Sequence, residues 1–152
     1  MLRDDLQKAL KESMLNKDTA TVSAVRLIIA GMKEKDVDAR GKGQEKASDA
    51  ELLSMMQNMI KQRNDSIKMY TDGNRVDLAD KERKEISIIE RFLPKQMNDA
   101  EVENAIKTVI AATGASSMKD MGKVMAELRG KYAGQMDFGK ASGVIKAQLA
   151  GN

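Results

Sequence analysis

Few residue types in this chain could carry out chemistry. Histidine and cysteine are both absent from its 152 residues. Their absence excludes thiolate chemistry, metal binding by thiolate or imidazole, and any nucleophile that a histidine base would activate. Catalysis would have to use carboxylate, lysine, tyrosine or hydroxyl groups. A chain without cysteine is typical of a reducing compartment, and we therefore expect a cytoplasmic location.

Paired carboxylates are the remaining arrangement suited to acid–base catalysis. Asp36 and Asp38 form one such pair, and Glu82 and Glu85 form another. Nothing in the sequence places either pair in a cleft, so we interpret both as solvated surface charges. A glycine-rich phosphate loop with its lysine and hydroxyl is also missing. We therefore predict no catalytic residues, no metal and no cofactor, and we expect that the protein is not an enzyme on its own.

Basic residues are distributed unevenly along the chain. Residues 118–152 contain six Lys or Arg and three acidic residues, whereas residues 1–117 contain twenty of each. The formal net charge of +3 therefore comes from the last quarter of the sequence. A localised excess of positive charge indicates a polyanionic partner, most simply RNA. An ordinary solvated helix face would have a similar composition, so charge alone leaves both interpretations open.

The candidate RNA-binding residues are the basic residues of this region: Lys119, Lys123, Arg129, Lys131 and Lys140. Lys119 and Lys123 are four residues apart and so share a helix face, where they could contact phosphates or keep the surface solvated. Gly122 lies within the same helical pattern, where glycine costs about 1 kcal/mol relative to alanine. The natural explanation is the close approach of a backbone, from a neighbouring helix or from a ligand, and we favour helix packing.

Aromatic residues number only four, which limits recognition by base stacking. Tyr132 could stack on a base, but one tyrosine is a poor platform for a single strand. Recognition of folded RNA through phosphates and shape suits this composition better. We do not expect DNA as a partner. We do not expect a membrane either, because no apolar run reaches the length of a membrane span.

Apolar residues recur at helical spacing along nearly the whole chain, and no segment has the alternation of a strand. The expected helices cover residues 2–15, 18 to about 36, 48–71, 76–92, 98–114, 117 to about 130, and 137 onward, with an exposed loop at 39–47. Pro94 forbids continuation of a helix. The pattern predicts an all-α protein with an N-terminal four-helix module, residues 1–93, and a compact C-terminal three-helix module, residues 96–150.

Local signals place several helix ends. Ser48 with Glu51, and Asn98 with Glu101, have the spacing of capping boxes. Residues 72–74 are expected to end the third helix, and Gly73 is able to adopt a left-handed conformation there. A group of charged residues surrounds this turn, and we interpret it as structural: Arg63, Arg75, Asp77 and Glu82.

Three blocks of sequence, in order along the chain, resemble the YqeY-like family. The first runs from Lys61 through Arg75 to Glu82, the second covers 92–97, and the third covers 117–125 and leads into the final helix. The C-terminal half is similar to the tail domain of the GatB subunit of tRNA-dependent amidotransferases. Family members are labelled amidotransferase-like, as carbon–nitrogen ligases with glutamine as amido donor, because of this similarity.

The resemblance implies the same two helical modules and a role with tRNA. The similar tail domain helps to hold tRNA while other domains of the amidotransferase do the chemistry. We therefore expect a non-catalytic, tRNA-associated accessory protein that positions folded RNA. A tRNA synthetase or an amidotransferase subunit is the expected protein partner. An alternative is a protein–protein adaptor for such an enzyme, without direct RNA binding. Gln135 stands where the family usually has a basic residue, which weakens the RNA interpretation.

Overall fold

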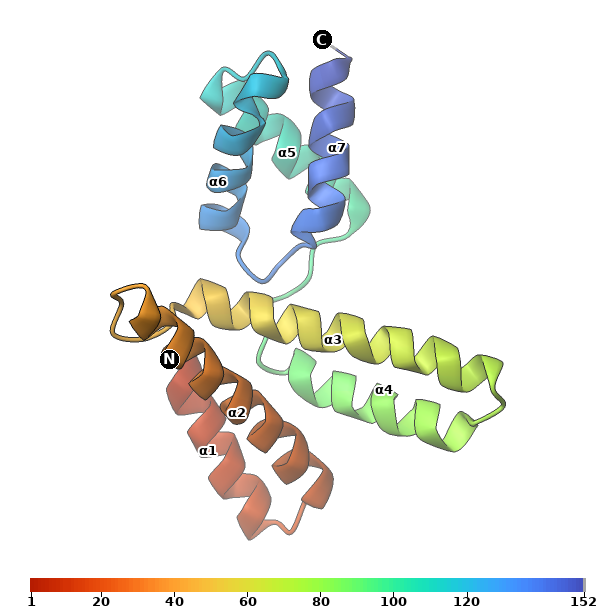
Figure 1. The fold of residues 1–152 in the computed structure, drawn as a ribbon. Coiled ribbons are helices and arrows are strands. Elements are labelled where there is room, and N and C mark those ends of the chain that lie inside the picture. Colours follow the sequence, from red (N-terminus) through yellow and green to blue (C-terminus); the bar gives the residue numbers. More distant parts are fainter. Residues whose placement is uncertain (152) are drawn as a thin grey trace. The chain divides into compact units, whose positions relative to one another are not determined.

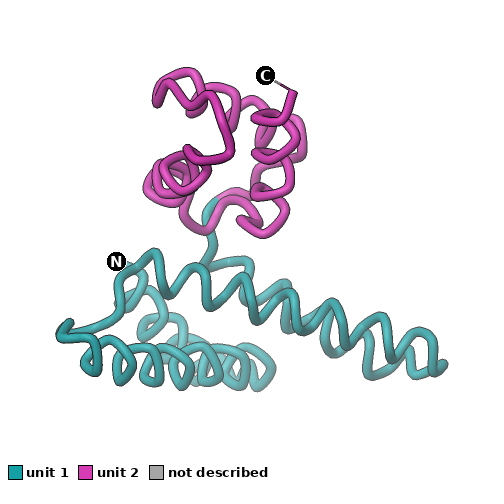
Figure 2. Tube along the Cα trace, turned by 45° about the horizontal axis from the view of Figure 1, so that its top comes forward, with its two compact units in different colours: residues 1–94 teal, residues 95–152 magenta. Residues whose placement is uncertain are grey.

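The computed structural model describes residues 1–151, which form seven α-helices, one short 3-10 turn and no strand (Figure 1). The predicted all-α fold is confirmed. The helices are α1 (Leu2–Leu15), α2 (Thr19–Gly41), α3 (Asp49–Asp72), α4 (Val76–Glu90), α5 (Asp99–Thr113), α6 (Met121–Tyr132) and α7 (Phe138–Ala150), and the 3-10 turn η1 (Met118–Asp120) precedes α6. The chain divides into two compact units, an N-terminal unit of Met1–Pro94 and a C-terminal unit from Lys95 onward (Figure 2).

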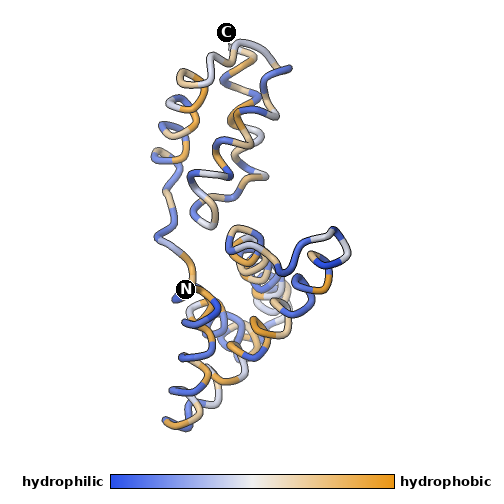
Figure 3. The backbone as a smooth tube through the Cα atoms, turned by 90° about the vertical axis from the view of Figure 1, so that its left-hand side faces the viewer, coloured by the Kyte–Doolittle hydropathy of each residue, from blue (hydrophilic) through white to orange (hydrophobic). Residues whose placement is uncertain are grey.

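Two helical hairpins make up the N-terminal unit. α1 packs against α2, α3 packs against α4 along their lengths, and α2 also contacts α3 and α4 (Figure 1). The core lies where the two hairpins meet, and its largest fully buried side chains are Leu6, Ile28, Leu52, Met56, Ile88 and Ile89. Along the helices, apolar residues are interspersed among polar ones, as amphipathic helices require (Figure 3). The distal part of the α3–α4 hairpin adds only Ala79 to the buried residues.

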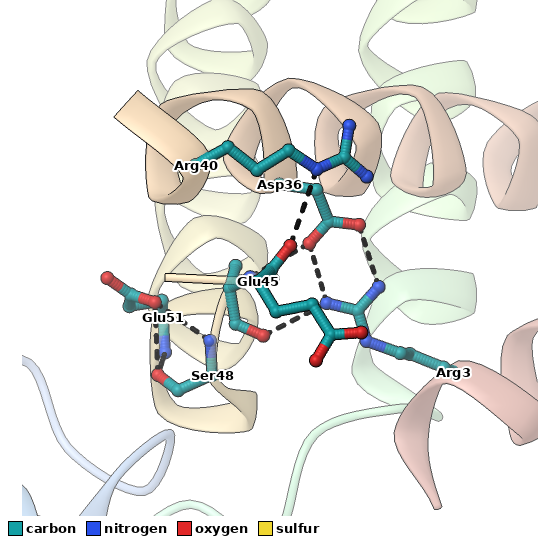
Figure 4. Close-up of polar contacts among 7 residues, drawn as sticks. Arg3, Asp36, Arg40, Glu45, Ser48 and Glu51 are labelled. Carbon is teal, nitrogen blue, oxygen red and sulfur yellow. Dashed lines mark hydrogen bonds and ion pairs between the residues drawn. The ribbon is translucent and has the colours of Figure 1, made fainter. Parts of the chain in front are cut away.

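The end of α2 lies further along the chain than predicted. We expected a loop over 39–47, but α2 continues to Gly41. Ala39 and Ala47 are both buried against the core, and burial of apolar surface favours the extra helical turn. The loop that follows is correspondingly shorter and is held at Ala47 by the side chain of Asp36 (Figure 4).

Asp36 joins three segments of the N-terminal unit. Its carboxylate accepts two hydrogen bonds from the Arg3 guanidinium, at 2.8 and 2.7 Å, and one from the Ala47 N–H, at 2.9 Å (Figure 4). The hydrogen bonds from Arg3 and Ala47 lower the pKa of Asp36 to about 2. Asp36 therefore connects α1, α2 and the loop before α3. The interpretation of Asp36 as a solvated surface charge is wrong.

The turn between α3 and α4 uses a different left-handed residue from the one predicted. Gly73 has φ −89°, in the ordinary region, and Asn74 has φ +58°. Asparagine is one of the few residues with a side chain that adopts this conformation readily. The helix ends where predicted, but Asn74 and not Gly73 adopts the left-handed conformation.

The charged group near this turn separates into two contacts. Arg63 Nε donates to Glu85 Oε2 at 2.9 Å and lies 4.0 Å from Glu82 Oε2, so it joins α3 to α4. Arg75 pairs separately with Asp77, at 3.2 Å, where both side chains are exposed. Glu82 and Glu85 are thus engaged by one guanidinium, and the structure shows no shared cluster of all four predicted residues.

The C-terminal unit contains three mutually packed helices, α5, α6 and α7. Its fully buried side chains include Ile106, Val124, Leu128 and Ile145. The helix predicted to begin at Ser117 starts instead with η1, and the α-helical hydrogen bonds begin at Met121. Asp120 stabilises the start of η1, because its carboxylate accepts hydrogen bonds from the N–H groups of Ser116 and Ser117.

The capping box at the start of α5 gives a stability prediction. Asn98 Oδ1 accepts the Glu101 N–H at 2.8 Å, and Glu101 Oε2 accepts the Asn98 N–H at 2.9 Å. We expect Asn98→Ala to destabilise the C-terminal unit by about 1 kcal/mol, measured by urea unfolding. Asn104→Ala is the matched control, because this exposed asparagine lies within α5 and its side chain makes no hydrogen bond in residues 1–151. Equal losses for the two variants would contradict the role of the cap.

Candidate nucleic-acid interface

All five predicted RNA-binding residues lie in the C-terminal unit and are exposed. They occupy three elements: Lys119 is on η1, Lys123, Arg129 and Lys131 are on α6, and Lys140 is in the first turn of α7. At 3.6 residues per turn, Lys123 and Arg129 project on different sides of α6. The predicted residues therefore do not form a single row.

Lys123 has a structural contact that the sequence did not indicate. Its Nζ donates to the main-chain oxygen of Thr113, the last residue of α5, at 3.1 Å. This bond satisfies one of the carbonyls left free at a helix end. Asp120 lies nearby, and its pKa is lowered mainly by the N–H groups of Ser116 and Ser117, with a smaller contribution from Lys123. The ammonium has three donors, so Lys123 can still contact a phosphate.

Arg129 and Lys131 also have partners within the unit. The Arg129 guanidinium lies 5.8 Å from the centre of the Phe138 ring, a cation–π contact between α6 and α7. Lys131 Nζ is 4.0 Å from Glu127 Oε2, and such an exposed pair contributes little to stability. Within residues 1–151, the side chains of Lys119 and Lys140 make no ion pair. These two lysines are therefore the most available for phosphates.

A line of small residues runs along the exposed side of α6. Gly122, Ala126 and Gly130 are spaced by four and are all exposed; we call them the α6 crest. A Cβ added at Gly122 or Gly130 would meet no heavy atom within 4 Å. The expected close packing on Gly122 is therefore wrong, because no neighbouring element of the described chain approaches it. By helical periodicity, Lys123 lies on one side of this crest and Arg129 on the other.

α7 repeats this arrangement. Gly139, Gly143 and Ala147 are exposed at a spacing of four and form what we call the α7 crest. A Cβ at Gly143 would also meet nothing within 4 Å, whereas a Cβ at Gly139 would lie 3.1 Å from Oδ1 of Asp137, the residue that caps α7. Lys140 and Lys146 lie on opposite sides of this crest by helical periodicity. Sequence reasoning missed Lys146 as a site residue, and its spacing of three from Gly143 is the signal that could have found it.

The two crests expose helix backbone between cations. Glycine in a helix interior is less favourable than alanine by about 0.5–1 kcal/mol, and packing within the unit does not explain Gly122, Gly130 or Gly143. A bulky partner could approach these backbones closely while its negative charges meet the flanking Lys and Arg. α5 differs, because Asp99, Glu101 and Glu103 outnumber Lys107 along it. The positive charge of the unit is therefore concentrated on α6 and α7.

The described residues offer little support for other chemistry. Residues 1–151 contain no group of three or more metal-ligating side chains placed to hold an ion. Of the carboxylates considered for acid–base work, Asp36 is bound by Arg3, and Glu82 and Glu85 lie against Arg63. None of the helices described is both long and apolar enough to cross a membrane.

The fold and surface define an all-α protein with two helical units, the second of which exposes two glycine-containing crests between cations. Comparison with known families matches residues 3–149 to the family described as Yqey-like protein. The chain belongs to the YqeY-like family, and the resemblance found in the sequence is confirmed.

Several fungal relatives share the name "Altered inheritance of mitochondria protein 41, mitochondrial". The relative from Lachancea thermotolerans is 30% identical over 151 residues, which cover 95% of this chain and 77% of the relative. The one from Vanderwaltozyma polyspora is 33% identical over 76% of this chain and 64% of its own length. The one from Candida glabrata is 36% identical over 58% of this chain and 47% of its own length. Their shared name mentions neither RNA nor a catalytic activity.

These relatives contradict the cytoplasmic location that we predicted. Each carries the word mitochondrial in its name, which disagrees with a cytoplasmic location, so the prediction is wrong. The prediction rested on the absence of cysteine, which excludes disulfides. That absence does not distinguish between compartments in which proteins lack disulfides, so the sequence held no signal for choosing the cytoplasm.

Proposed function

We propose that this protein is a non-catalytic accessory protein that binds folded RNA, and tRNA in particular, through the α6 and α7 crests and the cations beside them. The observation that supports this proposal most strongly is the repeated arrangement of exposed glycines between basic residues on two neighbouring helices. Packing within the unit does not account for Gly122, Gly130 and Gly143, whereas a closely approaching partner would.

Folded RNA matches this surface in both shape and charge. The minor groove of an A-form helix is wide and shallow, and proteins recognise it mainly by shape and by contacts with phosphates and 2′-hydroxyls. A helix whose exposed line is glycine and alanine can approach such a groove without side chains in the way. Lys140 and Lys146 beside the α7 crest, and Lys123 and Arg129 beside the α6 crest, would meet the phosphates.

The similarity of the C-terminal half to an amidotransferase tail supports tRNA over other folded RNAs. In that enzyme the tail helps to hold tRNA while other domains do the chemistry. By analogy, this protein would present tRNA to a tRNA synthetase or to an amidotransferase subunit. Gln135, at a position usually basic in the family, removes one phosphate contact, so we expect moderate affinity.

Charge reversal of two available lysines tests the proposal. We expect Lys119→Glu with Lys140→Glu to weaken tRNA binding at least about tenfold, measured by fluorescence anisotropy with tRNA and with an unrelated folded RNA of similar size. The loss of two phosphate contacts should also reduce the slope of log affinity against log salt by about two. The matched control is Lys11→Glu with Lys68→Glu, which changes the net charge equally on the exposed surface of the N-terminal unit.

The outcomes separate RNA binding from an adaptor role. A larger loss for the C-terminal pair than for the control, with a preference for tRNA, supports the proposal. Equal losses for the two pairs, or equal binding to both RNAs, would show that net charge alone explains the binding, and would contradict the proposal. The absence of tRNA binding would leave the protein–protein adaptor, whose apolar contacts should hardly respond to salt.

A further inference from the structure

A hollow of about 440 Å³ lies in the C-terminal unit, beside α5 and the turn between α6 and α7. Its floor and rim include Lys95, Met97, Asn104, Thr108 and Tyr132. Main-chain hydrogen bonding fixes one wall, because the Met97 N–H donates to the Gln135 oxygen at 2.9 Å. The Gln96 side chain adds a bond to the Gly134 oxygen at 2.6 Å. The hollow is thus held open by backbone that is itself anchored.

Tyr132 supplies an aromatic surface to this hollow. It is the last residue of α6, is half-buried against the core, and lines the hollow together with Met97 and Ala105. A single ring cannot hold a run of stacked bases. One ring is enough for one base, and losing one base–aromatic stacking contact weakens binding about tenfold.

Polar groups that can read the edge of a base lie in the same hollow. Asn104 is exposed, and its side-chain amide makes no hydrogen bond within residues 1–151. A free amide offers a donor and an acceptor side by side, the pair that asparagine uses on adenine. Glu101 accepts the Asn98 N–H through Oε2, and its second oxygen can accept from an exocyclic amino group.

A cation stands at the rim. Lys95 is exposed, lines the hollow, and makes no ion pair within the described residues. An aromatic ring, a free amide, a carboxylate oxygen and a lysine are together the groups that a nucleotide requires: a face to stack on, an edge to read, and a phosphate to neutralise.

We propose that this hollow binds one unpaired nucleotide of RNA, with its base stacked on Tyr132, its amino-bearing edge on Asn104 and Glu101, and its phosphate near Lys95. The site is separate from the crests, although its RNA ligand rests on the proposed function. Adenine is favoured over uracil, because uracil has no exocyclic amino group to donate to Glu101.

A second hollow adjoins this site and is lined by one residue of the predicted interface. Its volume is about 340 Å³, it shares Gln96, Met97 and Gln135 with the first, and Lys140 lines its other side. Lys140 also flanks the α7 crest. Lys140 therefore lines a hollow that adjoins the one containing Tyr132.

Two short RNAs test the site in the full-length chain. We would titrate the protein with the hexanucleotides rA6 and rU6 and follow amide shifts by NMR. We expect rA6 to shift the Asn104 side-chain amide and the Thr108 and Gln135 main-chain amides, and to bind more tightly than rU6. Tyr132→Ala should weaken rA6 binding about tenfold, as loss of one stacking contact implies. Asn104→Ala should remove most of the preference for rA6.

Further variants guard against a folding defect at Tyr132, which packs on the core. Tyr132→Phe keeps the ring and should keep most of the rA6 affinity. Asn104→Ala changes only an exposed side chain, and Asn64→Ala, an exposed asparagine on α3, is its matched control and should have no effect.

Three results would overturn the proposal: equal affinity for rA6 and rU6 with shifts confined to the crests, no effect of Asn104→Ala on the preference, or no binding of either hexanucleotide. In each case tRNA binding that is lost on charge reversal of Lys119 and Lys140 would leave the proposed function standing. Conversely, rA6 binding in the hollow without tRNA binding would support the site and contradict the tRNA role.

Discussion

Replacing Gly130 and Gly143 by glutamine should raise the stability of the protein and at the same time lower its affinity for tRNA. Both glycines are exposed on their helices, have ordinary φ values, and have no neighbour within 4 Å of an added Cβ. Glutamine is a good helix former, so each substitution should stabilise its helix by about 0.5–1 kcal/mol. The longer side chains would stand on the crests, where the proposed interface needs bare backbone.

The opposite signs of the two effects make this experiment informative. A mutation that damages the fold lowers both stability and binding, whereas these two glutamine substitutions should raise stability and lower tRNA affinity. Glutamine carries no charge, so the electrostatic attraction to RNA stays the same. We therefore expect tRNA affinity to fall by more than about tenfold through lost groove contacts. The salt slope should change little, because the flanking cations keep their charges.

Urea unfolding and anisotropy with tRNA measure the two effects on the same samples. Gly41→Gln is the matched control, because Gly41 is a helical glycine in the N-terminal unit with open space around its Cβ position. The control should leave tRNA binding unchanged. If the crest variant binds tRNA like the unsubstituted protein, the crests are not the interface, whatever happens to stability.

Helix beginnings could be predicted well because their signals are local. Ser48 and Asn98 each form the capping box that the spacing to Glu51 and Glu101 indicates. Asp137, where we expected the last helix to begin, accepts the main-chain N–H groups of Gly139 and Lys140 at the start of α7. A cap involves residues three positions apart, and the sequence shows both members.

Helix ends and contacts between elements could not be predicted in this way. α2 extends to Gly41 because Ala39 is buried by residues distant in sequence, and Asp36 is bound by Arg3, 33 positions earlier. The left-handed residue at the α3–α4 turn is Asn74 and not Gly73, although both types permit that conformation. In each case the contact or backbone geometry that decides the outcome cannot be read from the residues adjacent in sequence.

The candidate site was predictable in its composition but not in its form. The charge excess led to five exposed residues in one unit, but the bond from Lys123 to Thr113 and the contact of Arg129 with Phe138 depend on how the helices pack. Gly122 was interpreted as a packing residue, and only the structure shows open space there. The hollow beside Tyr132 is formed by three separate segments and has no counterpart in the sequence pattern.

Removing the Asp36 side chain should destabilise the N-terminal unit strongly for a residue so close to the surface. Asp36→Ala leaves the Arg3 guanidinium and the Ala47 N–H without their acceptor (Figure 4). The side chains of this ion pair are largely sheltered from solvent: that of Arg3 is 24% exposed and that of Asp36 is 15% exposed. Hydrogen bonds to charged groups contribute about 1.5–3 kcal/mol, so we expect a loss of about 2 kcal/mol near neutral pH.

This loss should depend on pH in a definite direction. The pKa of Asp36 is about 2 in the folded protein, below its ordinary value of 3.8. A carboxylate with a lowered folded pKa stabilises the fold above its unfolded pKa, and this stabilisation disappears as pH falls through the folded value. The difference in unfolding free energy between Asp36→Ala and the unsubstituted protein should therefore be constant above about pH 5 and shrink between about pH 4 and pH 2.

Urea unfolding at a series of pH values measures this difference, with Asp38→Ala as the matched control. Asp38 lies on the same helix two residues on, but it is exposed. Its removal should change stability by less than about 0.5 kcal/mol. An Asp36→Ala loss that matched the control, or that persisted unchanged down to pH 2, would show that the ion pair does not hold α1 and the loop before α3 onto α2. A loss that vanishes in acid would identify Asp36 as the charge that fixes the end of α2, where sequence reasoning placed a flexible loop.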